Sequence, residues 1–336
     1  MGYHLSDGTL YTYVTGDEYE DISAAWDWNI IPGTTTFYGS TPLNCATTAQ
    51  MGIEPFAGGV SNGNGEIGVA AMKYANPLNK EEKWQKAWFF LQGDVQRIMI
   101  SNISTPSSNA TILSVLDQKK HTGVVYVEAE QWDGVQTLHE NGTTTYDGPQ
   151  ALWHAGVGYT IDSNREDLSL VVELGEKKGN WSLIGTSKQP VFTVDLFSAS
   201  LHHNKIDNAA FVYTAYPGTE TVDDFYERKD STAVETVRND GDASAVYDWV
   251  NGKAMVVFWS PEGGSVDFSL GISLSSSTGS VLVFDTVSGE LTVSDPTQQL
   301  GKTDVTLKWG KLDKTITFEL PTGGQAGKGV SKNAYH

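Results

Sequence analysis

The chain has 336 residues, of which 39% are hydrophobic and 11% aromatic, so it can build a folded core and is not intrinsically disordered. Its formal net charge is -19, with 22 basic residues against 41 acidic ones, and a nucleic-acid phosphate backbone would be repelled. We therefore exclude nucleic acid as a partner. The single cysteine, Cys45, excludes an internal disulfide and is expected to be a small core residue.

Short segments that alternate apolar and polar residues recur between Gly, Pro, Asn and Asp clusters, which predicts an all-β fold. The predicted strands are Thr9–Val14, Ile67–Tyr74, Ala87–Leu91, Gln96–Ile100, Val124–Glu128, Leu168–Leu174, Val191–Phe197, Ala210–Tyr216, Lys253–Trp259, Ser280–Asp285, Val305–Trp309 and Thr315–Leu320. Short helices are expected only around Asp21–Trp26 and Asp223–Tyr226. The glycine-rich stretch 58–65 is expected to be a mobile loop.

A charged stretch with Pro and Gly between residues 217 and 240 predicts a domain boundary. We expect domains over 1–225 and 226–325, followed by a tail over 326–336 without periodicity. No apolar stretch reaches the roughly 18–20 residues of a membrane span, and the sequence as given has no secretion leader. Four glycosylation sequons nevertheless favour an extracellular or cell-surface location over a cytoplasmic one, at Asn102, Asn109, Asn141 and Asn180.

A first candidate site is the run Trp26-Asp27-Trp28-Asn29, which precedes a Pro-Gly turn. If the run is extended, the two tryptophans share one face and the two polar residues share the other. Aromatic faces stack on sugar C–H bonds while carboxylates and amides bind sugar hydroxyls, so this pattern could hold a carbohydrate. The alternative is that both tryptophans belong to the core.

A second candidate is the acidic run that contains Asp17, Glu18, Glu20 and Asp21. Clustered carboxylates could bind calcium, which takes 6–8 oxygen ligands. The run has no EF-hand spacing, and a solvated turn is the alternative.

Histidines offer weaker candidates. His4 and Tyr13 could form an acid-base pair, but their odd separation would place them on opposite faces of one strand. His202 and His203 lie at the end of a predicted strand, where they could bind a metal or substrate, but a surface position without such a role is the favoured expectation. His121 and His154 are expected at strand ends.

Six segments in a fixed order carry a family resemblance: GYHLSDGTLY (2–11), WDWNIIPGTT (26–35), KAWFF (86–90), LDQKK (116–120), WHAGVGY (153–159) and AYPG (215–218). Together they resemble polysaccharide lyase family 8, which includes hyaluronate, chondroitin and xanthan lyases. The resemblance runs from residue 2 to about 325.

The resemblance implies an antiparallel β supersandwich followed by a smaller C-terminal β-sandwich. In the family an N-terminal α/α toroid carries the catalytic Asn, His, Tyr and Arg, and no position of this chain matches those motifs. The resemblance therefore assigns no catalytic residue. It places segment 2–36 on the β-side wall of the substrate cleft, with Tyr3, His4, Asp7, Trp26, Asp27, Trp28 and Asn29 as candidate sugar contacts. Some relatives bind calcium in the β part, which strengthens the calcium hypothesis.

Three functions are open from the sequence. The first is a lectin-like, carbohydrate-binding protein on a lyase-derived scaffold, without its own catalytic centre or a required cofactor; a homo-oligomer would raise its weak single-site affinity. The second is the C-terminal part of a lyase that needs a toroid in trans. The third is a structural or storage protein. The charge of -19 favours neutral sugars over polyanions.

Overall fold

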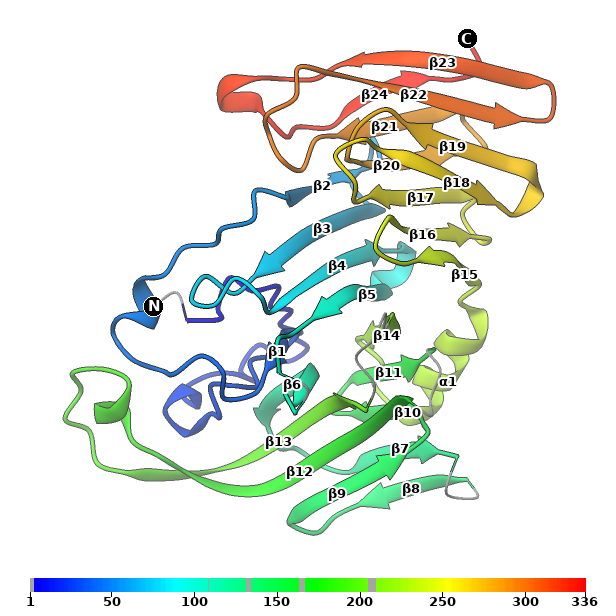
Figure 1. Cartoon of the computed structure of the whole chain (residues 1–336). Coiled ribbons are helices and arrows are strands. Elements are labelled where there is room, and N and C mark those ends of the chain that lie inside the picture. The colour runs from blue at the N-terminus through cyan, green and yellow to red at the C-terminus, as the bar shows by residue number, and fades with distance from the viewer. Residues whose placement is uncertain (1–2, 108, 131–133, 163–166, 205–209) are drawn as a thin grey trace.

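The computed structural model describes residues 3–107, 109–130, 134–162, 167–204 and 210–336. Gly2, the first residue of the resemblance, lies outside this range. The described residues form two packed β-sandwiches and one α-helix (Figure 1). The strand pairs are antiparallel. The predicted all-β class, with a larger sandwich before a smaller one, is confirmed.

The larger sandwich packs a nine-stranded sheet on a five-stranded sheet. The nine-stranded sheet has the order β2 (Ala57–Ser61), β3 (Gly68–Ala75), β4 (Lys83–Phe90), β5 (Gln96–Ser104), β14 (Phe211–Pro217), β11 (Val157–Ile161), β10 (Pro149–His154), β7 (Val125–Ala129) and β8 (Val135–Leu138). The five-stranded sheet has the order β1 (Thr35–Phe37), β6 (Ile112–Lys120), β13 (Phe192–His203), β12 (Leu168–Gly179) and β9 (Gly142–Asp147). Alternating inward residues such as Ile98 and Leu170 fill the space between the sheets.

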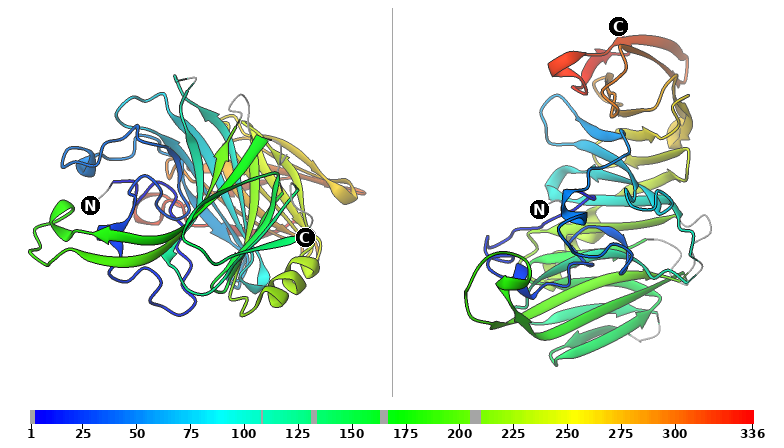
Figure 2. Two further views of the ribbon diagram at one scale, coloured as in Figure 1. Left: turned by 90° about the horizontal axis from the view of Figure 1, so that it is seen from below. Right: turned by 60° about the vertical axis from the view of Figure 1, so that its left-hand side comes forward.

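The smaller sandwich stands at one end of the molecule (Figure 2). Its six-stranded sheet has the order β15 (Val234–Asn239), β16 (Ala243–Asp248), β17 (Lys253–Phe258), β20 (Ser280–Asp285), β21 (Glu290–Ser294) and β24 (Val330–Asn333). Its four-stranded sheet has the order β18 (Gly264–Phe268), β19 (Ile272–Ser276), β22 (Lys302–Trp309) and β23 (Leu312–Glu319). Phe258, Phe284 and Phe318 are fully buried between these sheets.

A shared core joins the two sandwiches. On β4, Trp84 and Trp88 point into the larger core, whereas Ala87 and Phe89 point into a second core. That second core also contains Met255 of β17 in the smaller sandwich. Because successive strand residues face opposite sides, one strand serves both cores. The two sandwiches therefore pack directly on each other.

The N-terminal segment, residues 3–34, lacks the strand predicted at Thr9–Val14, whereas the short helix expected around Asp21–Trp26 is present as one 3-10 turn. It holds a single 3-10 turn at Ser23–Ala25 and no strand. The stretch Thr9–Val14 pairs with no strand. Three of its amides bond to other acceptors: Leu10 N donates to the Pro32 carbonyl (2.9 Å), Thr12 N to the Tyr19 hydroxyl (3.2 Å) and Val14 N to the Glu18 carboxylate (2.7 Å). The segment lies along the larger sandwich beside the projecting β12–β13 hairpin (Figure 2).

Three other expectations are corrected. The stretch 58–65 begins inside β2 rather than in a loop. At Gly59 a Cβ would lie only 2.4 Å from the Val69 carbonyl oxygen of β3, so the close approach of the two strands requires glycine there. Cys45 is exposed in the connection between β1 and β2. The predicted tail 326–336 contains β24, which pairs with β21.

Helix α1 (Val222–Ser231) is longer than the predicted Asp223–Tyr226. A capping box starts it: Thr221 Oγ1 accepts from Asp224 N (3.1 Å), and the Asp224 carboxylate accepts from Thr221 N (2.9 Å). Phe225 is buried against Gly158, where a Cβ would collide with its ring at 2.0 Å. The expected boundary at 225/226 falls within this helix. Among the described residues, no helix has the length and apolarity to cross a membrane.

Candidate functional site

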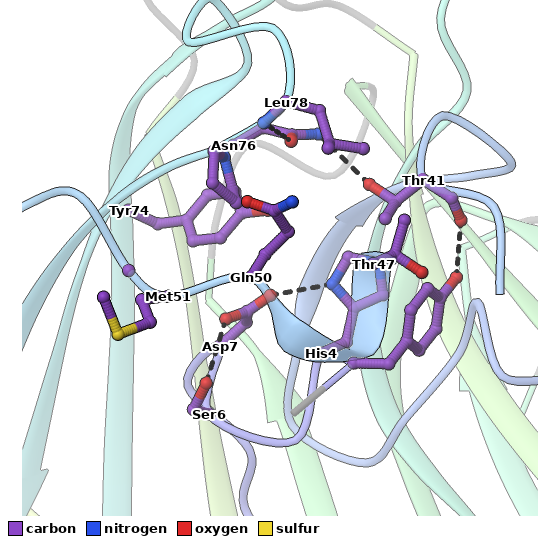
Figure 3. Close-up of a pocket in the computed structure, with 13 residues that line it drawn as sticks. His4, Ser6, Asp7, Thr41, Thr47, Gln50, Met51, Tyr74, Asn76 and Leu78 are labelled. Carbon is purple, nitrogen blue, oxygen red and sulfur yellow. Dashed lines mark hydrogen bonds and ion pairs between the residues drawn. The ribbon is translucent and has the colours of Figure 1, made fainter. Parts of the chain in front are cut away.

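All seven sequence-predicted sugar contacts line two adjoining hollows on the N-terminal segment. The His4 hollow, about 30 Å³, is lined by Tyr3, His4 and Asp7 together with Tyr74 and residues of the 41–52 connection (Figure 3). The Trp28 hollow, about 430 Å³, is lined by Tyr3 and by the predicted set Trp26, Asp27, Trp28 and Asn29. Tyr3 and Thr41 belong to both hollows. The structure therefore brings together residues that are more than twenty positions apart in the sequence.

In the His4 hollow, polar groups are oriented by their neighbours. His4 Nδ1 lies 2.8 Å from Asp7 Oδ2, and the Tyr3 hydroxyl donates to the Thr41 carbonyl (2.7 Å). Burial, and then the Asp27 and Asp7 carboxylates, raise the pKa of Tyr3 to about 12. The Tyr3 hydroxyl thus stays protonated at neutral pH, and its hydrogen bond to Thr41 fixes residues 41–52 of the chain between β1 and β2. Because Asp7 takes Nδ1, the His4 nitrogen left for an external partner is Nε2.

The two tryptophans have different environments. Because the segment turns after Ser23–Ala25, their rings meet edge to face at 5.8 Å instead of sharing one exposed face. Trp28 is buried at 9% exposure, and its Nε1 donates to the Ser23 carbonyl (3.0 Å). Trp26 is half-buried and stacks on Tyr11 at 6.2 Å. Trp28 is therefore a core residue, and Trp26 is the tryptophan that keeps exposed surface.

Asp27 is fixed by three donors. Its Oδ1 accepts from the Asn29 main-chain N (2.9 Å) and from Asn29 Nδ2 (2.8 Å), and its Oδ2 accepts from the Tyr38 hydroxyl (2.7 Å). That hydrogen bond, more than burial, raises the pKa of Tyr38 to about 12. The buried Gln118 of β6 pairs with the Asp27 main chain through both its amide oxygen (2.9 Å) and its amide nitrogen (3.1 Å). The carboxylate is held rigidly and retains acceptor capacity for a ligand hydroxyl.

A third hollow, the Tyr38 hollow of about 410 Å³, shares Trp26 and Asp27 with the Trp28 hollow. Its other wall comes from β12, where Lys177 forms an ion pair with Glu173. The turn at the tip of the β12–β13 hairpin adds Leu183 to the Trp28 hollow. Sequence reasoning missed Tyr38, Gln118 and these hairpin residues, because nothing in the local sequence links them to the Trp26 run.

Beneath the hollows, β4 anchors the N-terminal segment. The fully buried Lys86 donates through Nζ to the Gly33 carbonyl (2.8 Å) and lies 5.0 Å and 5.7 Å from the Trp84 and Trp88 ring centres. Burial lowers the pKa of Lys86 to about 7. Gly8 rests on the same tryptophans, and a Cβ there would lie 3.0 Å from Trp88. One buried lysine therefore ties the segment to the sheet.

The acidic run does not converge. Glu18 is buried at 7% exposure and accepts from the main-chain N of Val14, Thr15 and Gly16, which lowers its pKa to about 2. Asp17 is exposed and lies 3.6 Å from Lys120 Nζ, while Glu20 and Asp21 are exposed. Across the described ranges, no group of three or more His, Cys, Asp or Glu side chains could hold a metal ion. These four residues do not fit a calcium ion in this arrangement.

The histidines outside the hollows have structural environments. His121 and His154 follow or end strands, as expected. His203 is buried rather than at the surface; its Nε2 lies 2.8 Å from Ser114 Oγ, and burial lowers its pKa to about 3. His202 is half-buried, and burial lowers its pKa as well.

The sequon asparagines differ in exposure. Asn102, Asn109 and Asn141 are exposed, so their amides are accessible. Asn180 is half-buried and caps the 3-10 turn Trp181–Leu183, with its Oδ1 accepting from Ser182 N (3.0 Å). Glycosylation of the Asn180 side chain would therefore compete with its capping hydrogen bond to Ser182 N.

Comparisons with known proteins agree with this architecture. Residues 1–228 match the super-sandwich domain of polysaccharide lyase family 8, and residues 235–304 match the C-terminal beta-sandwich domain of that family. Chondroitinase-AC of Pedobacter heparinus is 26% identical over 345 residues, which cover 98% of this chain and 46% of that protein.

Two solved structures share the fold. A chondroitinase AC lyase, studied as enzyme-oligosaccharide complexes, has a TM-score of 0.83 at 24% identity. The match covers 98% of this chain and 47% of the chondroitinase chain. A Paenibacillus xanthan lyase has a TM-score of 0.82 at 19% identity, and the match covers 98% of this chain and 33% of the xanthan lyase chain. The chain thus spans less than half the length of these relatives. It belongs to polysaccharide lyase family 8, of which it carries the super-sandwich and the C-terminal β-sandwich.

Proposed function

We propose that this chain is a lectin-like protein that binds carbohydrate across the His4, Trp28 and Tyr38 hollows, without a catalytic centre of its own. The observation that carries the proposal is the pairing of a partly exposed Trp26 with an Asp27 carboxylate fixed by Asn29 and Tyr38. A sugar ring can stack on the indole while its hydroxyls donate to the carboxylate. The family supports a carbohydrate partner, since a Streptomyces coelicolor relative was solved in complex with chondroitin sulphate.

The ligand we propose is an uncharged glycan. Three carboxylates line the hollows, from Asp7, Asp27 and Glu173, and Lys177 is already paired with Glu173. The whole chain carries a net charge of -19. A uronate or sulfate group would meet repulsion here, whereas the hydroxyls of a neutral sugar would find acceptors.

A glycan-array screen of the full chain, with and without EDTA, tests this proposal. We expect binding of neutral glycans that EDTA leaves unchanged, because the acidic run does not converge on a metal site. Trp26→Ala should remove binding, whereas Trp249→Ala, at a tryptophan 45% exposed in the smaller sandwich, should not. Salt-sensitive binding of sulfated or uronate polymers alone would contradict the neutral-sugar proposal, and silence on every glycan would favour a structural or storage role.

A second candidate is that the chain supplies the β-side wall of a lyase whose toroid acts in trans. Large apolar side chains are exposed around the hollows, including Met51 (81%) and Leu183 (78%), and could be covered by another domain. Absorbance from unsaturated uronate, seen only when a family toroid domain is added to the chain, would support this role. Absorbance from the chain alone would overturn both candidates.

Location and assembly are part of the same proposal. Three exposed sequon asparagines favour an extracellular or cell-surface protein, and a homo-oligomer would multiply weak single sites. Mass spectrometry of the protein purified from its source would detect the glycans. Sedimentation with and without ligand would give the oligomeric state.

A further inference from the structure

A separate cavity of about 330 Å³ lies where the two sandwiches meet, which we call the interdomain pocket. Glu54, Phe56 and Lys73 line it from the larger sandwich. Trp259, Gln299 and Leu300 line it from the smaller one. Its volume falls in the range of small-molecule sites, which occur preferentially at domain interfaces.

The floor of the interdomain pocket is rigid and apolar. Phe56 and Trp259 are buried, with ring centres 5.2 Å apart, and both belong to the core that joins the sandwiches. Ala57 N donates to the Pro296 carbonyl (3.1 Å), which fixes one sandwich against the other beside the pocket. At Gly279 a Cβ would lie 2.9 Å from the Ser260 carbonyl oxygen, so this wall of the pocket has no side chain. The pocket is therefore preformed.

Lys73 is the polar group over this floor. Its Nζ lies 5.3 Å from the centre of the Phe56 ring. Within the described parts of the chain this ammonium group makes no ion pair or hydrogen bond. Two other strand lysines have partners within the protein: Lys86 donates to the Gly33 carbonyl, and Lys253 pairs with Asp285 (2.8 Å). A half-buried ammonium with free donors gains most from an anionic acceptor brought into the pocket.

We propose that the interdomain pocket binds a small organic carboxylate with an apolar body. The carboxylate would accept from Lys73 Nζ, and the apolar body would lie on Phe56 and against Leu300. Burial lowers the pKa of Lys73, and the Glu54 carboxylate at the same pocket partly opposes that shift without forming an ion pair with the ammonium. This site lies apart from the three hollows and does not depend on the proposed carbohydrate function.

Three ligands of one shape separate the contributions: phenylacetate, uncharged 2-phenylethanol and cationic phenethylamine. Isothermal titration of the full chain, with saturation-transfer NMR, gives each affinity. We expect phenylacetate to bind at least about tenfold more tightly than 2-phenylethanol, as a charge-assisted hydrogen bond implies. Preference for phenethylamine would mean that Glu54 dominates and would overturn the proposal, as would equal affinities or no binding by any of the three.

Variants locate the site. Lys73→Met should weaken phenylacetate at least about tenfold and leave 2-phenylethanol unchanged, whereas Lys73→Arg should retain the preference. Lys332→Met is the matched control, because Lys332 also lies over a phenylalanine, 5.6 Å from the Phe318 ring centre, outside any pocket described above. Thermal melts check that each variant is folded. Equal loss in Lys73→Met and Lys332→Met would refute the assignment.

Discussion

The N-terminal segment and the smaller sandwich hold their structure in opposite ways. In the smaller sandwich, continuous ladders such as β22–β23 and a core of fully buried aromatic residues spread stability over many contacts. Residues 3–34 have no ladder of their own; they are held by single side chains, chiefly Lys86, Gln118 and Glu18, and by isolated main-chain hydrogen bonds such as Gly33 N to the Val115 carbonyl. A candidate binding surface can thus be disorganised by one substitution while the scaffold stays folded. Functional surfaces are often built this way, on irregular chain supported by rigid sheets.

The largest effect should come from the scaffold. Phe284→Ala removes a fully buried ring from the smaller core, and we expect a loss of about 3–5 kcal/mol in the free energy of unfolding. Urea denaturation monitored by circular dichroism measures it. A loss below about 1 kcal/mol would show that this core is not where the stability lies.

A smaller and more local effect is expected from Lys86→Met. The Gly33 carbonyl would lose its partner, which costs about 1–3 kcal/mol, but the substitution also removes a buried charge that opposes folding. Hydrogen exchange should therefore accelerate at Leu10 and Gly33, whose amides bond to Pro32 and Val115, more than in β22–β23. Uniform acceleration across the chain would contradict the contrast between the two regions.

The same lysine predicts a pH dependence. Because burial lowers its pKa from 10.5 to about 7, the unfolded chain binds more protons than the folded chain between these values. Stability from this group should therefore rise as pH increases from about 7 towards 10.5. The corresponding slope should vanish in Lys86→Met, which denaturation at several pH values would measure.

Glu18 predicts a pH dependence of stability in the acidic range. Its lowered pKa of about 2, against an ordinary 4.5, means that its contribution is fully present above pH 4.5 and is lost as pH falls through 2. Glu18→Gln should remove this dependence and cost about 1–2 kcal/mol locally, because it weakens the hydrogen bonds to Val14, Thr15 and Gly16. Glu20→Gln, at an exposed carboxylate of the same run, is the control.

The smallest effect should come from Tyr38→Phe. It removes one of the three donors to Asp27, so we expect glycan affinity to fall by roughly 0.5–1.5 kcal/mol without a change in the free energy of unfolding. Tyr13→Phe, at a tyrosine of the N-terminal segment that is 60% exposed, should leave affinity unchanged. Equal losses of glycan affinity in both variants would show that the Asp27 carboxylate does not contact the ligand.

Most strands were predictable because alternation depends on neighbours in the sequence. The predicted Ser280–Asp285 coincides with β20, and Ile67–Tyr74 differs from β3 by one residue at each end. The same rule failed at Thr9–Val14, where alternation is present but the neighbouring chain offers Tyr19 and Glu18 side chains instead of a strand edge. Periodicity records which side chains face the core and does not record whether a partner strand exists.

The sequence by itself determined the all-β class, the order of the two sandwiches and the family, because these depend on patterns along the chain. Only the tertiary structure decided that Trp28 is buried while Trp26 is partly exposed, and that Glu18 turns inward away from its acidic neighbours. The physical reason is that the partners of these residues are distant in sequence: Gln118 meets Asp27 across 91 positions, and Lys86 meets Gly33 across 53. Such contacts leave no local pattern, so the candidate binding surface appears only when the sheets have packed.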